Sequence, residues 1–471
     1  MYIVSNCRYA AVFLSIISHD PIYLSCIKLL LFPFFLGNAK PFYKTLIYCT
    51  KVATEELFVN IVMILVAARI LGEIFQRIGQ PALVGELVAG LIIGPSILGL
   101  VLPNPDLEVL SNLAVFFLMF LAGLQMDARE IRRSGKSALV ISIVAFFPPL
   151  MSGMFASILF GLTTIQSLFM GLLLSITAVP VSAMVLMQFG VLNSRLGSTV
   201  ITAAVVNDIM SLMVLSIILQ VAAEGDSSQM NLGSIAISGS KVAAFLGGIF
   251  LFDILLRRTA GWLRRKVEPF FKKLQTREAA FGILLITTIV VSLIAQEIGL
   301  HFLIGTFFSG LIVYKGMIGR QNFNKVYGII SAITFGFFAP IFFTLIGIEF
   351  NVVSLLSAIP LFLSLLGVAI VSKVVGAYAG AKIVGFNREL SLAIGFLMNG
   401  RGMVELVIAA IGFAAGLIDM TLFSIAVAIG LITSILAPIT SRPLISSAKS
   451  KGSEAVMVKD PSSNEWQPEM A

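Results

Sequence analysis

The stretch LVGELVAGLIIG at residues 83–94 matches LIGTFFSGLIVY at residues 303–314, at an offset of 220 residues. A second pair, FFLMFLAGLQMD at 116–127 and PIFFTLIGIEFN at 340–351, is offset by 224 residues. Because two separate pairs give nearly the same spacing, the sequence indicates an internal repeat, and that repeat decides the predicted fold.

Both copies lie in a chain whose composition is typical of a membrane protein. The 471 residues are 58% hydrophobic and 12% charged, with a mean hydropathy of +1.01, whereas a soluble protein carries about 25% charged residues. Apolar stretches of about 20 residues, each long enough to span a bilayer, recur along most of the chain. The sequence therefore predicts an all-α polytopic membrane protein.

We expect thirteen transmembrane spans, and the repeat sets the orientation of the two halves. The spans are 57–78, 82–102, 108–126, 137–161, 165–189, 196–223, 233–256, 278–297, 300–318, 326–349, 354–384, 389–414 and 417–441. The first copy falls in spans 2 and 3 and the second in spans 9 and 10. An offset of seven spans inverts one copy relative to the other, as in secondary transporters.

This spacing divides the chain into five parts. They are an N-terminal extension of unassigned role (1–56), a first inverted repeat (57–223), a linker helix with a basic cytoplasmic loop (224–277), a second inverted repeat (278–441) and a short disordered cytoplasmic tail (442–471).

The distribution of Lys and Arg predicts the topology. Loops after odd-numbered spans, such as RRTAGWLRRKVEPFFKKLQTRE, are basic, and loops after even-numbered spans, such as EGDSSQMN, contain no Lys or Arg. The positive-inside rule then places the C-terminus in the cytoplasm of a multi-pass protein of the cell membrane. The net charge of +8 is thus an orientation signal, and we expect no nucleic-acid partner.

The sequence predicts no cofactor. The three cysteines and two histidines have no zinc-ligand spacing, so we expect no metal other than the transported cation. No GxxxxGK[ST] motif is present, so ATP-driven transport is not expected.

Asp208 stands in the apolar run VVNDIMSL, near the middle of the sixth span. Ionisable groups inside a membrane mark ion or proton pathways, although a structural carboxylate is the plain alternative. A carboxylate in a partly wet cavity can bind either a proton or a small hard cation. One group that releases H⁺ as it takes Na⁺ is a minimal exchanger. The adjacent Asn207 cannot titrate, and it either contacts the ion or makes an interhelical hydrogen bond.

Two spans carry residues that interrupt a helix. In SITAVPVSAM (175–184), Pro180 lacks a backbone donor, so we expect a break that offers carbonyls and the Thr177 hydroxyl to a cation. At an offset of 224, Thr177 falls on Arg401 in NGRG, whose glycines permit a second break. The two broken helices are expected to cross, and Arg401 could compensate carbonyl ends there. An intrahelical pair with Glu405 is the plainer interpretation of Arg401.

Two further charged residues lie inside spans. Lys373, in IVSKVVGAYAG, is expected to tune the pKa of the site or to compensate its charge, as are Arg401 and Glu405. Glu86, in GELVAG, either lines an access funnel or belongs to a local network.

These motifs resemble those of the monovalent cation:proton antiporters, in the branch with bacterial Na⁺/H⁺ antiporters and glutathione-gated K⁺ efflux transporters. The likeness covers about residues 57–441, through GELVAGLIIGPSILG, TAVPVSAMVL, VVNDIMSL, the Lys373 span and RGMVEL. It implies a homodimer with a six-helix core, Asp208 as the ion carrier, Thr177 at a broken helix, and Lys373 facing Asn207 and Asp208. Relatives with Asn–Asp are generally electroneutral, but many of them carry Arg where this chain has Lys373.

We therefore expect an antiporter that exchanges Na⁺ or Li⁺ for H⁺ by alternating access, with a 1:1 ratio. Its partners would be the monovalent cation, H⁺ and the lipid bilayer. K⁺/H⁺ exchange and Na⁺-coupled symport of an organic anion stay open on the same fold. An enzyme is not expected, because neither HExxH nor a second catalytic Asp occurs in a suitable span.

Overall fold

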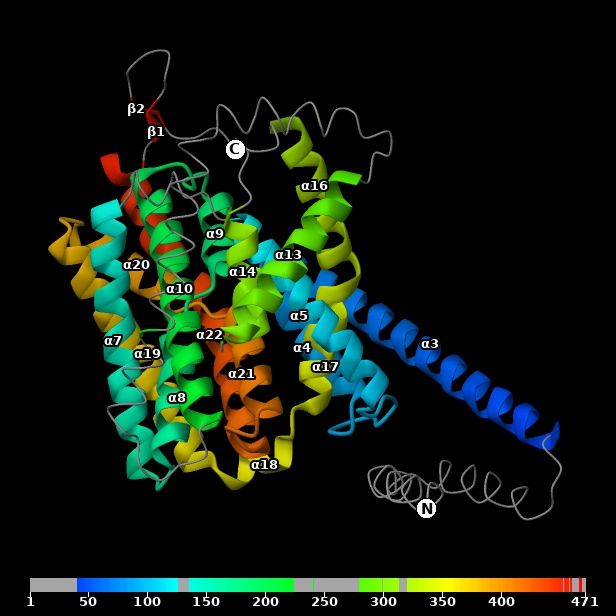
Figure 1. The fold of residues 1–471 in the computed structure, drawn as a ribbon. Helices are drawn as coiled ribbons and strands as arrows, with labels where there is room; N and C mark the ends of the chain where they lie inside the picture. The colour runs from blue at the N-terminus through cyan, green and yellow to red at the C-terminus, as the bar shows by residue number, and fades with distance from the viewer. Residues whose placement is uncertain are drawn as a thin grey trace. The chain divides into compact units, whose positions relative to one another are not determined.

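The computed structural model describes residues 40–125, 135–223, 240, 279–298, 300–312, 320–451, 453–456, 458–459 and 466–467. These residues are predominantly helical (Figure 1). The helices up to the end of the first predicted repeat are α3 (Lys40–Arg77), α4 (Ala82–Ile93), α5 (Pro105–Gln125), α7 (Gly135–Leu159), α8 (Thr164–Ser175), α9 (Val179–Gln188) and α10 (Arg195–Ala223).

The remaining elements follow in the second half of the chain. The helices are α13 (Ala279–Glu297), α14 (Phe302–Ile312), α16 (Arg320–Ile333), η2 (Thr334–Phe338), α17 (Ala339–Glu349), α18 (Val352–Ser357), α19 (Ile359–Ile383), α20 (Arg388–Met398), α21 (Met403–Ala414), α22 (Met420–Ser450) and η3 (Glu454–Val456). A short antiparallel ladder near the C-terminus pairs β1 (Val458–Lys459) with β2 (Trp466–Gln467), with Val458 opposite Gln467.

The predicted all-α membrane fold is confirmed. Among the described residues, nine helical spans are long and apolar enough to cross a bilayer, and three shorter apolar helices accompany them. Most of the predicted seventh span, 233–256, and the basic loop that follows it lie outside the described residues. The packing discussed below lies within the compact unit Ile64–Ala471.

Three helix boundaries differ from the sequence prediction. Helix α4 ends at Ile93 and not near residue 102, because Pro95 has no backbone N–H to continue the helix. The chain then turns back, with a positive φ of 62° at Gly99. Helix α3 begins at Lys40, inside the predicted N-terminal extension. Helix α22 continues to Ser450, beyond the predicted end of the last span at residue 441.

The matched stretches of the two halves make equivalent helix contacts. A Cβ on Gly90 of α4 would lie 2.8 Å from the Cα of Gly347 in α17. A Cβ on Gly310 of α14 would lie 3.0 Å from the Cα of Gly123 in α5. Gly90 matches Gly310, and Gly123 matches Gly347, at the two offsets found in the sequence. Glycine at these positions lets the helix backbones approach closely.

A second pair of contacts repeats in the same way. A Cβ on Gly85 of α4 would lie 2.4 Å from the carbonyl oxygen of Leu71 in α3. A Cβ on Gly305 of α14 would lie 3.0 Å from the carbonyl oxygen of Val291 in α13. Both residues of the second contact are 220 positions after those of the first. The sequence repeat therefore corresponds to repeated packing between helices.

Two helices are interrupted where the sequence predicted breaks. Helix α8 ends at Ser175 and α9 begins at Val179, with Pro180 in the first turn of α9, where its missing N–H costs nothing. Helix α20 ends at Met398 and α21 begins at Met403. In Figure 1, α8 lies below α9 whereas α20 lies above α21, so the two broken helices run in opposite directions.

Candidate ion-binding site

The two breaks lie against each other. The backbone N–H of Ala178, in the first break, donates to the carbonyl of Gly400, in the second, over 2.8 Å. The Thr177 hydroxyl donates to Met398 O over 2.9 Å, and the Ser182 hydroxyl donates to Leu397 O over 2.8 Å. Side chains from the first broken helix therefore bind the last carbonyls of α20, and Leu397 O also accepts from the Gly400 backbone N–H over 3.2 Å.

Two basic residues bind the last carbonyls of α8. Arg401 donates from Nη1 to Leu173 O and from Nη2 to Leu174 O, each over 2.7 Å. Lys373, in α19, donates from Nζ to Ser175 O. Both side chains are 0% exposed. Positive charge at this end of α8 complements the negative end of the helix dipole, so both basic groups have a structural partner at the end of α8.

Glu405 pairs with Arg401, as the sequence suggested, but the pair is not intrahelical because Arg401 lies in the break before α21 begins at Met403. Nη1 of Arg401 lies 2.8 Å from Oε1 of Glu405, four residues along the chain, and the carboxylate is 1% exposed. The other oxygen, Oε2, has no hydrogen-bond partner among the described residues. Ser434, in α22, donates to the carbonyl oxygen of Arg401 and holds the start of α21 from a third helix.

Asn207 connects three elements through its side-chain amide. Its Nδ2 donates to Ser175 O over 3.2 Å and to Thr177 Oγ1 over 3.0 Å. Its Oδ1 accepts from the hydroxyl of Ser142, in α7, over 2.9 Å. These contacts are the interhelical hydrogen bonds that were one of the two readings of Asn207 from sequence.

Asp208 follows Asn207 on α10 and is 3% exposed. Its Oδ1 has no hydrogen-bond partner within the described part of the chain. Lys373 is the basic residue whose charge acts on this carboxylate, although the Lys373 ammonium is hydrogen-bonded to Ser175 O. A buried carboxylate oxygen without a donor is costly, and a proton or a hard cation is the kind of partner that would satisfy it.

Glu86 belongs to a different environment. It is 6% exposed in α4, and the basic residue that acts on its charge is Arg69, in α3. Its backbone carbonyl accepts from the Thr344 hydroxyl over 3.2 Å. In the described part of the chain, no hydrogen bond or ion pair links Glu86 to Asp208.

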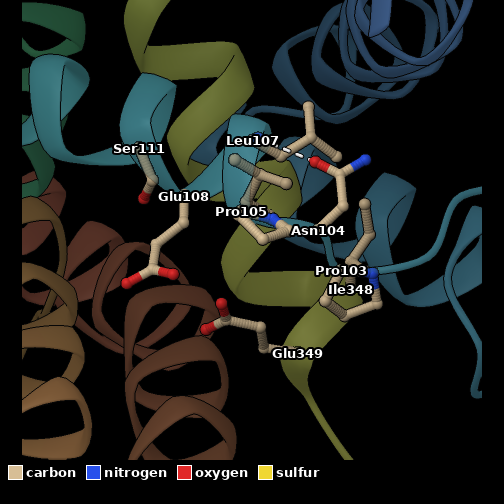
Figure 2. A pocket seen from close by; sticks show the side chains of 9 residues that line it. Pro103, Asn104, Pro105, Leu107, Glu108, Ser111, Ile348 and Glu349 are labelled. Atoms are coloured by element: carbon tan, nitrogen blue, oxygen red, sulfur yellow. Dashed lines mark hydrogen bonds between the residues drawn. The ribbon is translucent and has the colours of Figure 1, made fainter. Parts of the chain in front are cut away.

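A pocket of about 250 Å³ lies elsewhere, between the start of α5 and the end of α17. Figure 2 shows the side chains of Glu108 and Glu349 extending toward one another there, and their two negative charges interact. Neither Asp208 nor a residue of the two breaks lines this pocket. It is therefore separate from the candidate ion site.

Sequence reasoning missed Ser142 and Ser434. Each is one of several serines on a largely apolar helix, 65 residues before Asn207 and 33 residues after Arg401 respectively. A serine in a membrane helix usually bonds to the carbonyl one turn earlier. Nothing in the sequence separated these two from such serines.

Known proteins resemble this chain over most of its length. The family described as "Sodium/hydrogen exchanger, transmembrane" matches residues 61–446. The Na(+)/H(+) antiporter of Enterococcus hirae is 31% identical over 350 residues, which is 74% of this chain and 88% of that protein. The Na(+)/H(+)-K(+) antiporter GerN of Bacillus cereus is 28% identical over 365 residues, covering 76% of this chain and 89% of that protein.

A solved structure shares the fold. The sodium proton antiporter MjNhaP1 from Methanocaldococcus jannaschii at pH 8 superposes with a TM-score of 0.65 and 17% sequence identity, covering 83% of this chain and 98% of that one. The family match over 61–446 and the Enterococcus hirae relative confirm the resemblance seen in the motifs. The chain belongs to the transmembrane sodium/hydrogen exchanger family.

Proposed function

We propose that this chain exchanges Na⁺ or Li⁺ for H⁺ across the cell membrane, with Asp208 as the group that holds either ion. The family supports cation/proton antiport as the activity. The observation that supports Asp208 as the carrier is its buried Oδ1, which has no hydrogen-bond donor among the described residues. The other carboxylate beside the breaks, Glu405, is held by Arg401 at 2.8 Å.

The two breaks hold oxygen atoms of the kind that bind a bare cation. Thr177 Oγ1 donates to Met398 O and accepts from Asn207, which leaves one of its two lone pairs free. The buried Asn399 Oδ1, in the second break, has no partner among the described residues. Small hard cations bind through such oxygens. In this proposal Thr177 contributes a ligand, and Asn207 holds the break rather than the ion.

The basic residues support a one-proton cycle. Lys373 and Arg401 donate to the end of α8, so their charge has a fixed function at a helix terminus. If both stay charged, only Asp208 exchanges a proton for a cation. One H⁺ then leaves as one Na⁺ binds, and exchange is 1:1 and electroneutral.

The proposal includes the assembly that the family resemblance implies. Residues 57–223 and 278–441 form two inverted repeats that rock or slide to expose Asp208 to each side in turn. The repeated glycine contacts of α4 with α17 and of α14 with α5 support this symmetry. The C-terminus is cytoplasmic, and the protein is a homodimer.

K⁺/H⁺ exchange is the second candidate. The relative GerN carries K⁺ in its name alongside Na⁺ and H⁺. Both cations use oxygen ligands, and discrimination between them depends on the geometry of the cavity.

Exchange in proteoliposomes with an internal pH dye tests the proposal. Na⁺, Li⁺ and K⁺ are added in turn to vesicles holding wild-type protein, Asp208→Asn or the control Glu73→Gln. Glu73 is a span carboxylate with an exposed partner, Arg77, so its variant should behave as wild type. Asp208→Asn should give folded protein without cation-driven proton flux. Wild-type-like flux from Asp208→Asn would exclude Asp208 as the carrier.

A further inference from the structure

A directed row of hydrogen bonds runs from α7 to the end of α20. Ser142 Oγ donates to Asn207 Oδ1 over 2.9 Å, and Asn207 Nδ2 donates to Thr177 Oγ1 over 3.0 Å. Thr177 Oγ1 in turn donates to Met398 O over 2.9 Å. The three side chains are 0% exposed. The row therefore joins α7, α10, the first break and α20 in a place where water does not compete for their hydrogen bonds.

The far end of the row fixes the direction of its last two bonds, from Asn207 to Thr177 and from Thr177 to Met398 O. Met398 O can only accept, so the single hydroxyl proton of Thr177 is committed to it. Thr177 must then accept from Asn207, and only Nδ2 of the amide can donate. Ser175 O, which also faces Nδ2 at 3.2 Å, demands the same orientation. The amide orientation, which is ordinarily inferred from its surroundings, has one consistent solution here.

The consequence falls on Ser142. With Nδ2 turned to the break, Asn207 Oδ1 faces α7, and the Ser142 hydroxyl is its donor among the described residues. The same hydroxyl also donates to Ala203 O over 3.1 Å, the carbonyl one turn earlier on α10, so its one proton is shared between the two acceptors and the shorter bond is to Asn207. Without the Ser142 hydroxyl, Oδ1 would be a buried acceptor with no donor. The amide would then rotate or shift, and Thr177 and Ser175 O would lose the group that holds them.

We propose that Ser142 is a positioning residue of the ion site. It does not touch the ion. Its hydroxyl fixes the Asn207 amide, which in turn holds Thr177 and the end of α8 in place beside Asp208. This inference rests on the proposed function, because it assigns Ser142 to the site built around Asp208.

A matched pair of serines on the same helix tests it. Ser157 is also 0% exposed in α7, and its Oγ has no hydrogen-bond partner in the described part of the protein. The measurement is the Na⁺ concentration that gives half-maximal exchange, KM, together with the maximal rate. Ser142→Ala should raise KM about tenfold, equivalent to about 1.4 kcal/mol. Ser157→Ala should leave KM unchanged. Ser142→Cys, with a weak S–H donor, should fall between wild type and Ser142→Ala.

Coupling to Asn207 separates positioning from a general packing defect. In an Asn207→Ala background the Ser142 hydroxyl keeps only Ala203 O as an acceptor. It no longer acts on the ion site, so Ser142→Ala should change KM by less than about twofold. The same comparison is made with the Na⁺-induced rise in melting temperature of the purified protein, which needs no transport. If Ser142→Ala does not fold, Ser142→Cys takes its place in both backgrounds.

Two results would overturn the proposal: a KM for Ser142→Ala equal to that of Ser157→Ala, or the full tenfold effect persisting without the Asn207 amide. A different result would show that the proposed function itself is wrong. Asp208→Asn would then keep both the Na⁺-induced thermal shift and the exchange, whatever the behaviour of Ser142→Ala.

Discussion

Replacing Arg401 with Met should destabilise the protein far more than removing a comparable ion pair at the surface. Arg401 lies 2.8 Å from Glu405, with the two side chains 0% and 1% exposed. At that distance two unit charges attract by roughly 6 kcal/mol at an effective dielectric constant of 20. Removing one partner of a buried pair leaves the other charge buried, which costs about 3–5 kcal/mol. The carbonyls of Leu173 and Leu174 lose their donors as well.

The chain offers a matched control and a rescue. Arg77 also pairs with a Glu four residues away, at 2.9 Å, but the two side chains are 77% and 57% exposed. Arg77→Met should cost at most about 1 kcal/mol. Adding Glu405→Gln to Arg401→Met should recover part of the loss, because the unpaired buried charge is then removed. Denaturant unfolding of the purified proteins compares the wild type with these three variants. An Arg401→Met variant as stable as Arg77→Met would refute the reasoning.

Three further outcomes follow from the same contacts. Thr177→Val removes a hydroxyl that both donates and accepts, so the Na⁺ concentration for half-maximal exchange should rise about tenfold, the effect of about 1.4 kcal/mol; an unchanged value would remove Thr177 from the site. Gly347→Ala would place a Cβ 2.2 Å from Leu87 O, so the melting temperature of this variant should fall. The control Gly282→Ala places a Cβ that meets nothing within 4 Å, so it should not lower the melting temperature. Equal melting temperatures for the two variants would contradict the close approach of the helices. Lys373→Met should slow exchange without producing a Na⁺-triggered current on a solid-supported membrane, because Lys373 donates a hydrogen bond to Ser175 O and does not carry a proton. A current that differs from that of the wild type would show that Lys373 takes part in proton transfer.

The sequence carried the architecture because its determinants are local or repeated. Pro180 lacks a backbone N–H, and the glycines around Arg401 adopt non-helical conformations readily, so both breaks could be predicted from residues close together in the sequence. The matched glycine-containing stretches also predicted the inverted repeat from the sequence alone. The end of α4 was predictable from Gly94 and Pro95, but the apolar run that follows them resembles more helix.

The details of the site depend on contacts between distant segments. Which way the Asn207 amide points follows from Met398 O, which lies 191 positions further along the chain. The binding of Lys373 to Ser175 O joins residues 198 positions apart. Such pairings arise from the packing of helices that are distant in the sequence, and the residue spacing within one helix does not predict them. Ser142 could not be predicted from sequence patterns, because its partner Asn207 lies on a different helix.

The central claim, that Asp208 alone exchanges one H⁺ for one cation, is tested most directly by the voltage dependence of exchange. Wild-type protein is reconstituted into proteoliposomes, the membrane potential is clamped with K⁺ and valinomycin, and Na⁺-driven proton flux is measured at several potentials with Asp208→Asn as the reference. The account predicts a flux that is absent in Asp208→Asn and independent of the potential in wild type. A voltage-dependent rate, accompanied by a Na⁺-triggered current that disappears in Asp208→Asn, would contradict the one-proton cycle.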